Sequence, residues 1–357
     1  MVVVAVAEAV VVAVAVTVVL VVAVAGRWLE RRTRRLLLRL RLRLRRLRLH
    51  PRDRPRRRAP AMPASPIHPQ SPSACMVIVG ASQGLGAALA ECAARRTGWG
   101  VVLTSRNAAR LALVAGEINA RYGAGTALAA PGDAALESDM VRVVDEAADR
   151  FGSVACVVFC TGVNHDAALA EWPDCAAFRE VVSTNLVGAG HVAFAALPHL
   201  SRSGGALVAI TSMAGVLGCV PGGSSYAASK AGMDAFFGSI APELKRVGVR
   251  TLIVEPGSFH ADDGAPRQVV GASAGRYAGA RAARRGVPAS AVAERVLDAV
   301  LAGRDGRVWP RTRLVPWLGL SLKMLVPSLF ERLAMRARPG ALPTVARPRG
   351  ARRPSDA

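Results

Sequence analysis

A buried-strand run, followed at once by closely spaced glycines and a helical stretch, is the feature that most constrains this chain. The run MVIVG (76–80) is apolar, ASQGLG follows it, and AALAECAARR is typical of a helix. The spacing of Gly80, Gly84 and Gly86 directs backbone N–H groups and a helix N-terminus toward an anion, with room for close approach. The pattern favours a phosphate-binding strand–turn–helix unit.

The same residues fit a second motif. Gly80, Ser82 and Gly84 match G-x-S-x-G, the nucleophile elbow of the α/β-hydrolases. An elbow follows several strands of its sheet, whereas only an apolar run and an Arg-rich stretch precede residue 75 here. Its position in the chain therefore favours the phosphate-binding interpretation.

Further apolar runs alternate with stretches of helical length. These runs are GVVLTSRN (100–107), TALAAPGD (126–133), VACVVFCTG (154–162), ALVAITS (206–212) and VRTLIVEPG (249–257). Strands alternating with helices indicate βαβ units. We expect an α/β fold, a doubly wound parallel sheet (Rossmann fold), with a single catalytic domain and an N-terminal hydrophobic anchor.

Three polar residues mark a candidate catalytic centre. Ser212 ends the fifth predicted strand, and Tyr226 and Lys230 lie four residues apart on a predicted helix, hence on one face. A cation beside a phenol lowers the phenol pKa from its usual value of about 10. A Tyr–Lys pair alone is more often an ordinary surface pair, but Ser212 lies at the sheet edge where ligands bind. The combination favours acid–base chemistry.

Arg106, at the end of the second predicted strand, bears on cofactor choice. Dinucleotide sites that select the form without a 2′-phosphate usually carry an acid here, whereas an arginine can bind that phosphate. The residue predicts NADP(H) in preference to NAD(H). A solvated arginine at a strand end is the alternative interpretation.

The first 74 residues differ from the rest in composition. Residues 1–26 are almost wholly apolar and long enough to cross a bilayer, although Glu8 interrupts them. Residues 27–58 contain sixteen arginines and two acidic residues, so this segment carries +14 of the net charge of +22. This order predicts a membrane anchor (1–26), an Arg/Pro-rich linker (27–74) and a catalytic domain that faces the cytosol, as in the endoplasmic reticulum. Import into a mitochondrion or plastid and a misassigned start are the alternatives.

The Arg-rich stretch suits anionic lipid head groups. It has no interleaved aromatic residues for base stacking, so no specific nucleic acid is expected. The six cysteines form no CxxC pair and no cluster with metal-ligand spacing, which predicts reduced thiols and no metal site.

The C-terminal part, 311–357, contains an apolar run from Leu314 to Phe330 with prolines near both ends. Shallow membrane insertion, a lid over an apolar substrate, or packing on the sheet edge are all compatible with it. The Pro/Arg-rich tail from about residue 338 is predicted to be disordered.

In order and spacing, several motifs together resemble those of the short-chain dehydrogenase/reductase family over roughly residues 75–310. They are GASQGLG, SRN, Asp133, Asn185 in TNLVG, ITS (210–212), YAASK (226–230) and PG (256–257). The resemblance implies that Tyr226 is the general acid and base, that Lys230 holds the nicotinamide ribose, that Ser212 binds the reacting oxygen and that Asn185 supports a proton relay. The cofactor-binding residues implied are Gly80, Ser82, Gln83, Gly84, Leu85, Gly86, Arg106, Asp133, Gly162, Tyr226 and Lys230.

Three positions depart from the family pattern. Val79 replaces a threonine before the first glycine, and Ala261 stands where many members have a threonine. The usual Asn-Asn-Ala-Gly is Phe159-Cys160-Thr161-Gly162, which predicts altered side-chain support beside the cofactor. None of these changes removes a proposed proton-transfer residue.

We therefore expect an NADP(H)-dependent oxidoreductase that interconverts a carbonyl and a secondary or primary alcohol. The anchor and the apolar C-terminal run suggest a lipophilic substrate: a steroid, retinoid, sphingoid or acyl ketone. A homodimer or homotetramer is compatible with the chain. The alternatives are an organelle-imported 3-ketoacyl reductase with residues 1–74 as presequence, and a non-catalytic cofactor-binding scaffold.

Overall fold

The computed structural model describes residues 74–218, 222–262, 286–308 and 314–336. The predicted anchor 1–26, the linker as far as residue 73 and the tail from residue 337 lie outside the described residues.

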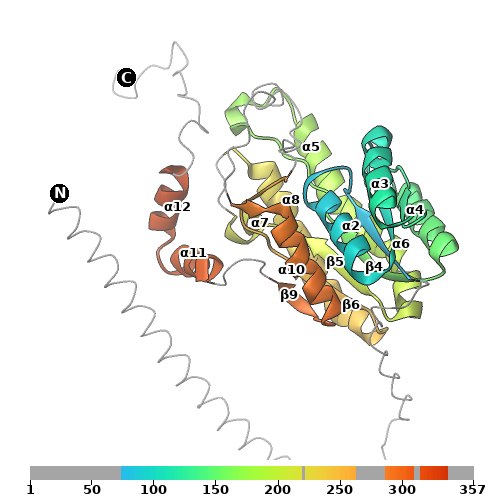
Figure 1. The fold of residues 1–357 in the computed structure, drawn as a ribbon. Helices are drawn as coiled ribbons and strands as arrows, with labels where there is room; N and C mark the ends of the chain where they lie inside the picture. Colours follow the sequence, from blue (N-terminus) through green and yellow to red (C-terminus); the bar gives the residue numbers. More distant parts are fainter. Residues whose placement is uncertain (1–73, 219–221, 263–285, 309–313, 337–357) are drawn as a thin grey trace, which may run out of the picture. The chain divides into compact units, whose positions relative to one another are not determined.

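Seven parallel strands form the main sheet, in the order β3-β2-β1-β4-β5-β6-β9 (Figure 1). They are β1 (Cys75–Val79), β2 (Gly100–Thr104), β3 (Ala127–Ala129), β4 (Val154–Phe159), β5 (Ala206–Ile210), β6 (Arg250–Val254) and β9 (Gly306–Val308). The chain order reverses between β1 and β4, and at such a reversal ligands bind beyond the carboxyl ends of the strands. The glycine turn after β1 and the loop after β4 meet there.

Helices cover both faces of this sheet. Met76 and Ile78 of β1 pack in a core with α2 (Gly84–Thr97), α3 (Ala108–Tyr122) and α10 (Ala289–Leu301). Val77 and Val79 point the other way, into a core with α4 (Glu137–Phe151), α6 (Gly188–Ser203) and α8 (Ser224–Arg246). Strands buried on both faces need apolar residues at every position, which is why these runs are continuous rather than alternating.

The six predicted strands are confirmed, and a seventh was missed. Strand β9 is three residues long and contains Arg307 between a glycine and a valine, so it has no apolar run. Arg307 instead pairs with Asp234 of α8, at 2.8 Å, and with the buried Glu255 that follows β6. A two-stranded sheet of β7 (Phe259–His260) and β8 (Val287–Pro288) was also not predicted.

The helical stretch around TNLVG is more irregular than expected. A short 3₁₀ turn (Leu169–Glu171) precedes α5 (Ala176–Val182), and a π-helix (Ser183–Val187) joins α5 to α6. Of the described residues, only the stretch Ala176–Ser203 is long and apolar enough to cross a membrane by length and composition, and half of its most apolar window is buried in the fold.

The C-terminal apolar run forms two helices, α11 (Leu314–Leu325) and α12 (Pro327–Arg336). Pro316 lies in the first turn of α11 and Pro327 is the first residue of α12, positions at which a proline costs no helical hydrogen bond. Helix α11 packs on α7 (Met213–Leu217). Shallow membrane insertion, a lid and packing on the sheet edge all stay predictions for this run.

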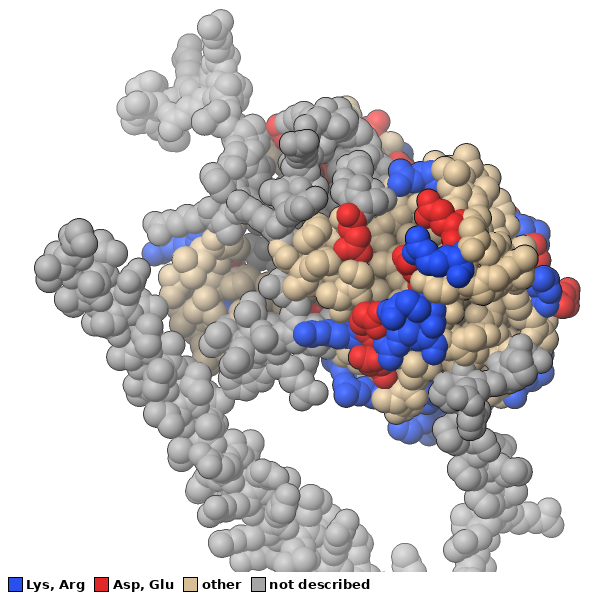
Figure 2. All heavy atoms as spheres, in the orientation of Figure 1, with Lys and Arg blue, Asp and Glu red and all other residues tan. Residues whose placement is uncertain are grey.

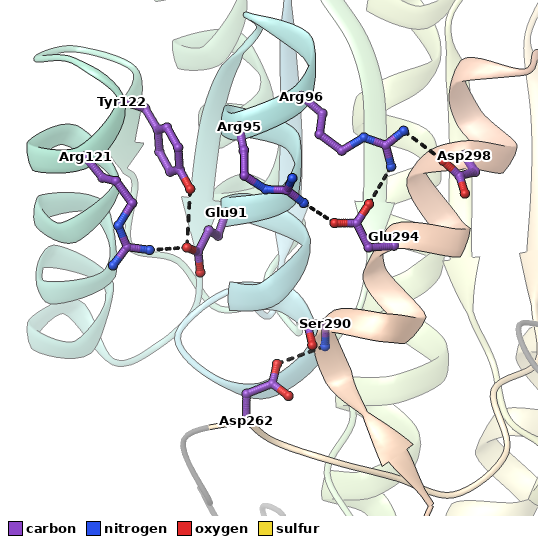
Figure 3. A network of polar contacts seen from close by, with 9 residues as sticks. All are labelled: Glu91, Arg95, Arg96, Arg121, Tyr122, Asp262, Ser290, Glu294 and Asp298. Carbon is purple, nitrogen blue, oxygen red and sulfur yellow. Dashed lines mark hydrogen bonds and ion pairs between the residues drawn. The ribbon is translucent and has the colours of Figure 1, made fainter.

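A polar network ties α2, the helix behind the glycine turn, to its neighbours (Figure 3). Arg96 binds Glu294 and, at 2.9 Å, Asp298 on α10, while Glu91 binds Arg121 on α3. Figure 2 shows that Lys and Arg alternate with Asp and Glu on the face drawn. The charges of this face are thus mixed, in contrast to the Arg-rich composition of residues 27–58.

Candidate functional site

The glycine turn forms a cradle at the N-terminus of α2. Gly80 has φ +93° and its N–H donates to Thr104 O of β2 at 2.8 Å, which fixes the turn. A Cβ at Gly86 would overlap the carbonyl oxygen of Gly80, so helix and strand approach as only glycine allows. Gln83 is the N-cap residue of α2 but makes no side-chain capping hydrogen bond to the helix, and the first turn carries no acid. These features fit a pyrophosphate, which would accept from the first N–H groups of α2.

The other predicted residues of this turn differ in environment. Ser82 is buried, and the Leu85 side chain packs in the sheet core. Leu85 can therefore reach a cofactor only through its backbone.

Arg106 and Asp133 follow adjacent strands, β2 and β3, and Gly132 N donates to Ser105 O at 3.2 Å between them. Arg106 is half-exposed and forms an ion pair at 3.8 Å with Glu180 of α5. The Asp133 carboxylate accepts from Ala135 N at 3.0 Å. The structure thus brings both predicted residues to one edge, with an acid, Glu180, that the sequence patterns did not indicate.

Lys230 lies at the carboxyl ends of the central strands. Its side chain is buried, and Nζ donates to Ile210 O of β5 at 2.9 Å and to Thr161 O, after β4, at 3.2 Å. Burial lowers the pKa of Lys230 from 10.5 to about 8. The two backbone carbonyls hold this ammonium in place. Among the described residues, no carboxylate forms a hydrogen bond with it.

Tyr226 shares this face of α8. Lys230 Nζ lies 5.9 Å from the centroid of the Tyr226 ring. A Cβ at Gly162 would lie 3.5 Å from Lys230 Nζ and 3.9 Å from Tyr226 Cε2, which are ordinary van der Waals distances, so the backbone at Gly162 runs beside both side chains. The pairing predicted from a four-residue spacing is therefore present, and Gly162 lies against it.

Ser212 caps a short helix that the sequence did not predict. Its Oγ accepts from Ala214 N at 3.1 Å at the start of α7. Gly215 of α7 packs against the backbone of Lys230 and Ala231, where a Cβ would lie 2.6 Å from either residue. This backbone contact holds Ser212 beside the turn of α8 that carries Lys230.

Asn185 braces the loop after β4 against α8. Its fully buried amide accepts from Val163 N and donates to Val163 O and to Ser229 Oγ, each at 2.9 Å. Ser229 Oγ donates in turn to Tyr226 O at 2.8 Å. Asn185 lies in the π-helix, an irregularity that often marks functional positions.

The unusual Phe159-Cys160-Thr161-Gly162 segment keeps the backbone contacts of the site. Cys160 N donates to Val79 O at 2.8 Å, and burial raises the pKa of its thiol to about 12. A Cβ at Gly80 would lie 2.8 Å from Thr161 Oγ1, so this hydroxyl packs on the glycine turn. Support for Lys230 comes from carbonyls, which any residue type supplies; no side-chain pattern could have indicated Thr161 or Ile210.

The comparisons with known proteins agree with this geometry. Residues 74–267 match the family model described as short chain dehydrogenase. The chain belongs to this family. It is 33% identical over 184 residues to the L-fucose dehydrogenase of Rattus norvegicus, covering 52% of this chain and 65% of that one. It is 30% identical over 187 residues to the 11-beta-hydroxysteroid dehydrogenase-like 3 of Arabidopsis thaliana, covering 52% and 59%.

Among solved structures, the alcohol dehydrogenase of Thermococcus sibiricus complexed with 5-hydroxy-NADP aligns with TM-score 0.56 and 25% identity. That alignment covers 66% of this chain and 94% of the other. The chain therefore spans less than two thirds of the curated relatives named above, but nearly all of this solved relative.

Proposed function

We propose that this protein is a nicotinamide-dependent oxidoreductase that interconverts a carbonyl and an alcohol, with NADP(H) preferred. The observation that carries the proposal is Lys230, a buried ammonium held by two backbone carbonyls beside Tyr226. A buried charge without a hydrogen-bonded carboxylate is costly to folding, and such groups gather at active sites.

In reduction, the Tyr226 hydroxyl donates its proton to the substrate oxygen as negative charge develops there. The Lys230 ammonium stabilises the phenolate that remains, and its fixed position makes that stabilisation available without rearrangement. Ser212 Oγ donates a hydrogen bond to the same substrate oxygen. Asn185 holds the Val163 loop and the Tyr226 turn at a constant separation. When bound, the nicotinamide supplies the hydride, and no metal is needed.

The cofactor would lie across the reversal between β1 and β4. Its pyrophosphate would accept from the N–H groups at Gly84 and Gly86, and Lys230 would donate to the nicotinamide ribose. Arg106 would bind the 2′-phosphate in place of Glu180, and Asp133 would contact the adenine. The solved relative with 5-hydroxy-NADP supports a nicotinamide cofactor; the choice of NADP(H) rests on Arg106.

The substrate is proposed to be lipophilic. Support comes from α11, α12 and the residue between them, where Met324, Leu325, Val326, Leu329 and Leu333 are between 43% and 81% exposed. Such an apolar surface favours contact with a membrane or with an apolar ligand. The hydroxysteroid dehydrogenase-like relative is compatible with this class.

The proposals about residues 1–74 stay predictions. The anchor, the cytosol-facing location at the endoplasmic reticulum and the 3-ketoacyl reductase with a presequence all depend on residues nearly all of which lie outside the described part of the chain. The domain division 1–26, 27–74, 75–310 and 311–357 and a homodimer or homotetramer also stay predictions.

The test is a screen of steroid, retinoid, sphingoid and acyl ketones with NADPH, followed by Tyr226→Phe. Removing the acid should lower kcat/KM about 10²–10⁴-fold. Tyr122→Phe is the matched control, because Tyr122 lies on α3 and donates to Glu91 at 3.4 Å. If Tyr226→Phe reduced ketones as fast as Tyr122→Phe, the mechanism would be wrong, and a folded protein that reduces none of them would favour the scaffold alternative.

A further inference from the structure

The loop after β4 carries two buried polar side chains that the proposed chemistry does not use. Asn164 is 7% and His165 is 1% exposed. Asn164 Oδ1 and His165 Nδ1 have no hydrogen-bond partner in the described part of the chain. A buried polar atom without a partner costs folding free energy, and polar groups in this state need an explanation.

The loop is held at both ends, which keeps these side chains from turning out to water. Val163 is fixed through both of its backbone groups by Asn185, each at 2.9 Å. Ala167 N donates to Gly222 O at 2.8 Å, just before α8. The imidazole of residue 165 lies 5.3 Å from the Trp172 ring, whose Nε1 donates to Ala167 O at 3.2 Å.

The residues that carry the unpartnered atoms follow the proposed reaction centre closely along the chain. Gly162, where an added Cβ would touch Lys230 and Tyr226, precedes Asn164 by two residues. Because consecutive Cα atoms are about 3.8 Å apart, the Asn164 Cα lies within about 8 Å of that of Gly162. Ser225, immediately before Tyr226, is also fully buried, and its Oγ has no partner in the described ranges. Buried polar atoms without a partner in the described ranges therefore occur on two segments of the site, the loop that follows Gly162 and the start of α8 just before Tyr226.

We propose that Asn164 and His165 form a polar subsite for a hydroxyl group that the substrate carries in addition to its reacting carbonyl. A hydroxyl has one proton to donate and two lone pairs to accept with, so it can donate to the amide Oδ1 and accept from the imidazole Nδ1 in the tautomer that carries its proton there. The substrate class is then a hydroxyketone, or the corresponding diol in oxidation, rather than a ketone with a bare hydrocarbon body. This inference rests on the proposed function, whose substrate it narrows.

The test compares Asn164→Leu and His165→Phe with Asn119→Leu. Asn119, on α3, is the matched control, because its amide donates to Ala127 O at 3.0 Å and accepts from Ala127 N at 2.8 Å. The probes are decan-2-one and decan-2-ones with one hydroxyl at successive carbons. The readouts are kcat/KM with NADPH and the rise in Tm that each ketone causes in the NADP-bound protein.

The wild-type protein and Asn119→Leu should prefer one hydroxyketone over decan-2-one at least about tenfold, because a buried polar site rejects an analogue that lacks the group. Asn164→Leu and His165→Phe should lose that preference through slower hydroxyketone reduction, with decan-2-one unchanged. Their own Tm should stay equal or rise, whereas that of Asn119→Leu should fall.

Each contrary result overturns the subsite. An equal preference for the hydroxyketone over decan-2-one in all four proteins, or no such preference in the wild type, would show that the two side chains do not bind a substrate hydroxyl. A Tm that falls in Asn164→Leu and His165→Phe as in Asn119→Leu would show that they serve the fold. If no ketone is reduced, the proposed function fails separately. In that case the Tm rise caused by the hydroxyketone still tests the subsite. A rise that is present in the wild type and lost only in Asn164→Leu and His165→Phe would establish the subsite, and no rise in the wild type would refute it.

Discussion

Two positive side chains of the site, Arg106 at the edge beyond β2 and Lys230 at the proposed reaction centre, are accommodated in opposite ways. Arg106 is 48% exposed, and its ion pair with Glu180 spans 3.8 Å between two solvated side chains. Lys230 is 2% exposed and donates to two backbone carbonyls at 2.9 and 3.2 Å. An exposed pair contributes little and can exchange partners, whereas a buried charge must be held by the fold. We expect the buried centre to control the rate and the exposed edge to control cofactor choice.

The largest effect is expected at the buried centre. Lys230→Met should lower kcat/KM for ketone reduction about 10²–10⁴-fold, because the phenolate of Tyr226 loses its stabilising charge. The measurement is NADPH absorbance under first-order conditions. Lys245→Met is the matched control on α8, since Lys245 is exposed and pairs with Asp305 at 2.8 Å. Equal activity of the two variants would contradict the contrast between centre and surface.

A smaller effect, on folding, should come from Asn185→Ala. The substitution leaves both backbone groups of Val163 buried and unpaired, so the free energy of unfolding should fall by about 2–5 kcal/mol. Urea unfolding at constant m-value measures it. Asn107→Ala should lose only about 1 kcal/mol, since Asn107 is an exposed helix cap that accepts from Arg110 N. A loss no greater than that of Asn107→Ala would mean that Asn185 is not a brace.

At the exposed edge, Arg106→Ala should raise the Kd of NADPH about ten- to hundredfold and leave that of NADH nearly unchanged. Glu180→Gln is the control of opposite sign: it removes the competing carboxylate and should lower the Kd of NADPH by roughly two- to fivefold. Titration calorimetry of the full chain measures both. If Arg106→Ala weakened both cofactors equally, the proposed phosphate role would be wrong.

The smallest effect is a pH dependence of the centre. A lysine loses its charge as the pH rises through its pKa, so kcat/KM for NADPH should fall above about pH 8, by roughly tenfold at pH 9. Stability should move the other way. Between about pH 8 and 10.5 only the unfolded chain keeps the proton, so the free energy of unfolding should rise with pH. Lys230→Met should abolish that rise in the free energy of unfolding. If the rise persisted in this variant, another titrating group would be its cause.

Local patterns predicted most of the fold. Continuous apolar runs located six of the seven strands of the main sheet, and the glycine spacing predicted the turn at Gly80. The exception, β9, is too short for a periodic signal, and its Arg307 is held by Asp234 and Glu255, residues remote in sequence. The π-helix at Asn185 and the helix capped by Ser212 were missed because both depend on what they pack against.

The sequence by itself determined the chemistry available to this protein: a glycine cradle, a Tyr–Lys pair at helical spacing, an arginine after the second strand and an order of elements that requires a parallel sheet. Local propensity and the polarity of single residues carry that information. Only the tertiary structure decided that Lys230 is held by the carbonyls of Thr161 and Ile210 and that Glu180 faces Arg106. It also decided that Asn164 Oδ1 and His165 Nδ1 are buried with no hydrogen-bond partner among the described residues. Those facts depend on which backbone and side-chain groups meet across elements distant in sequence, and no single segment specifies that.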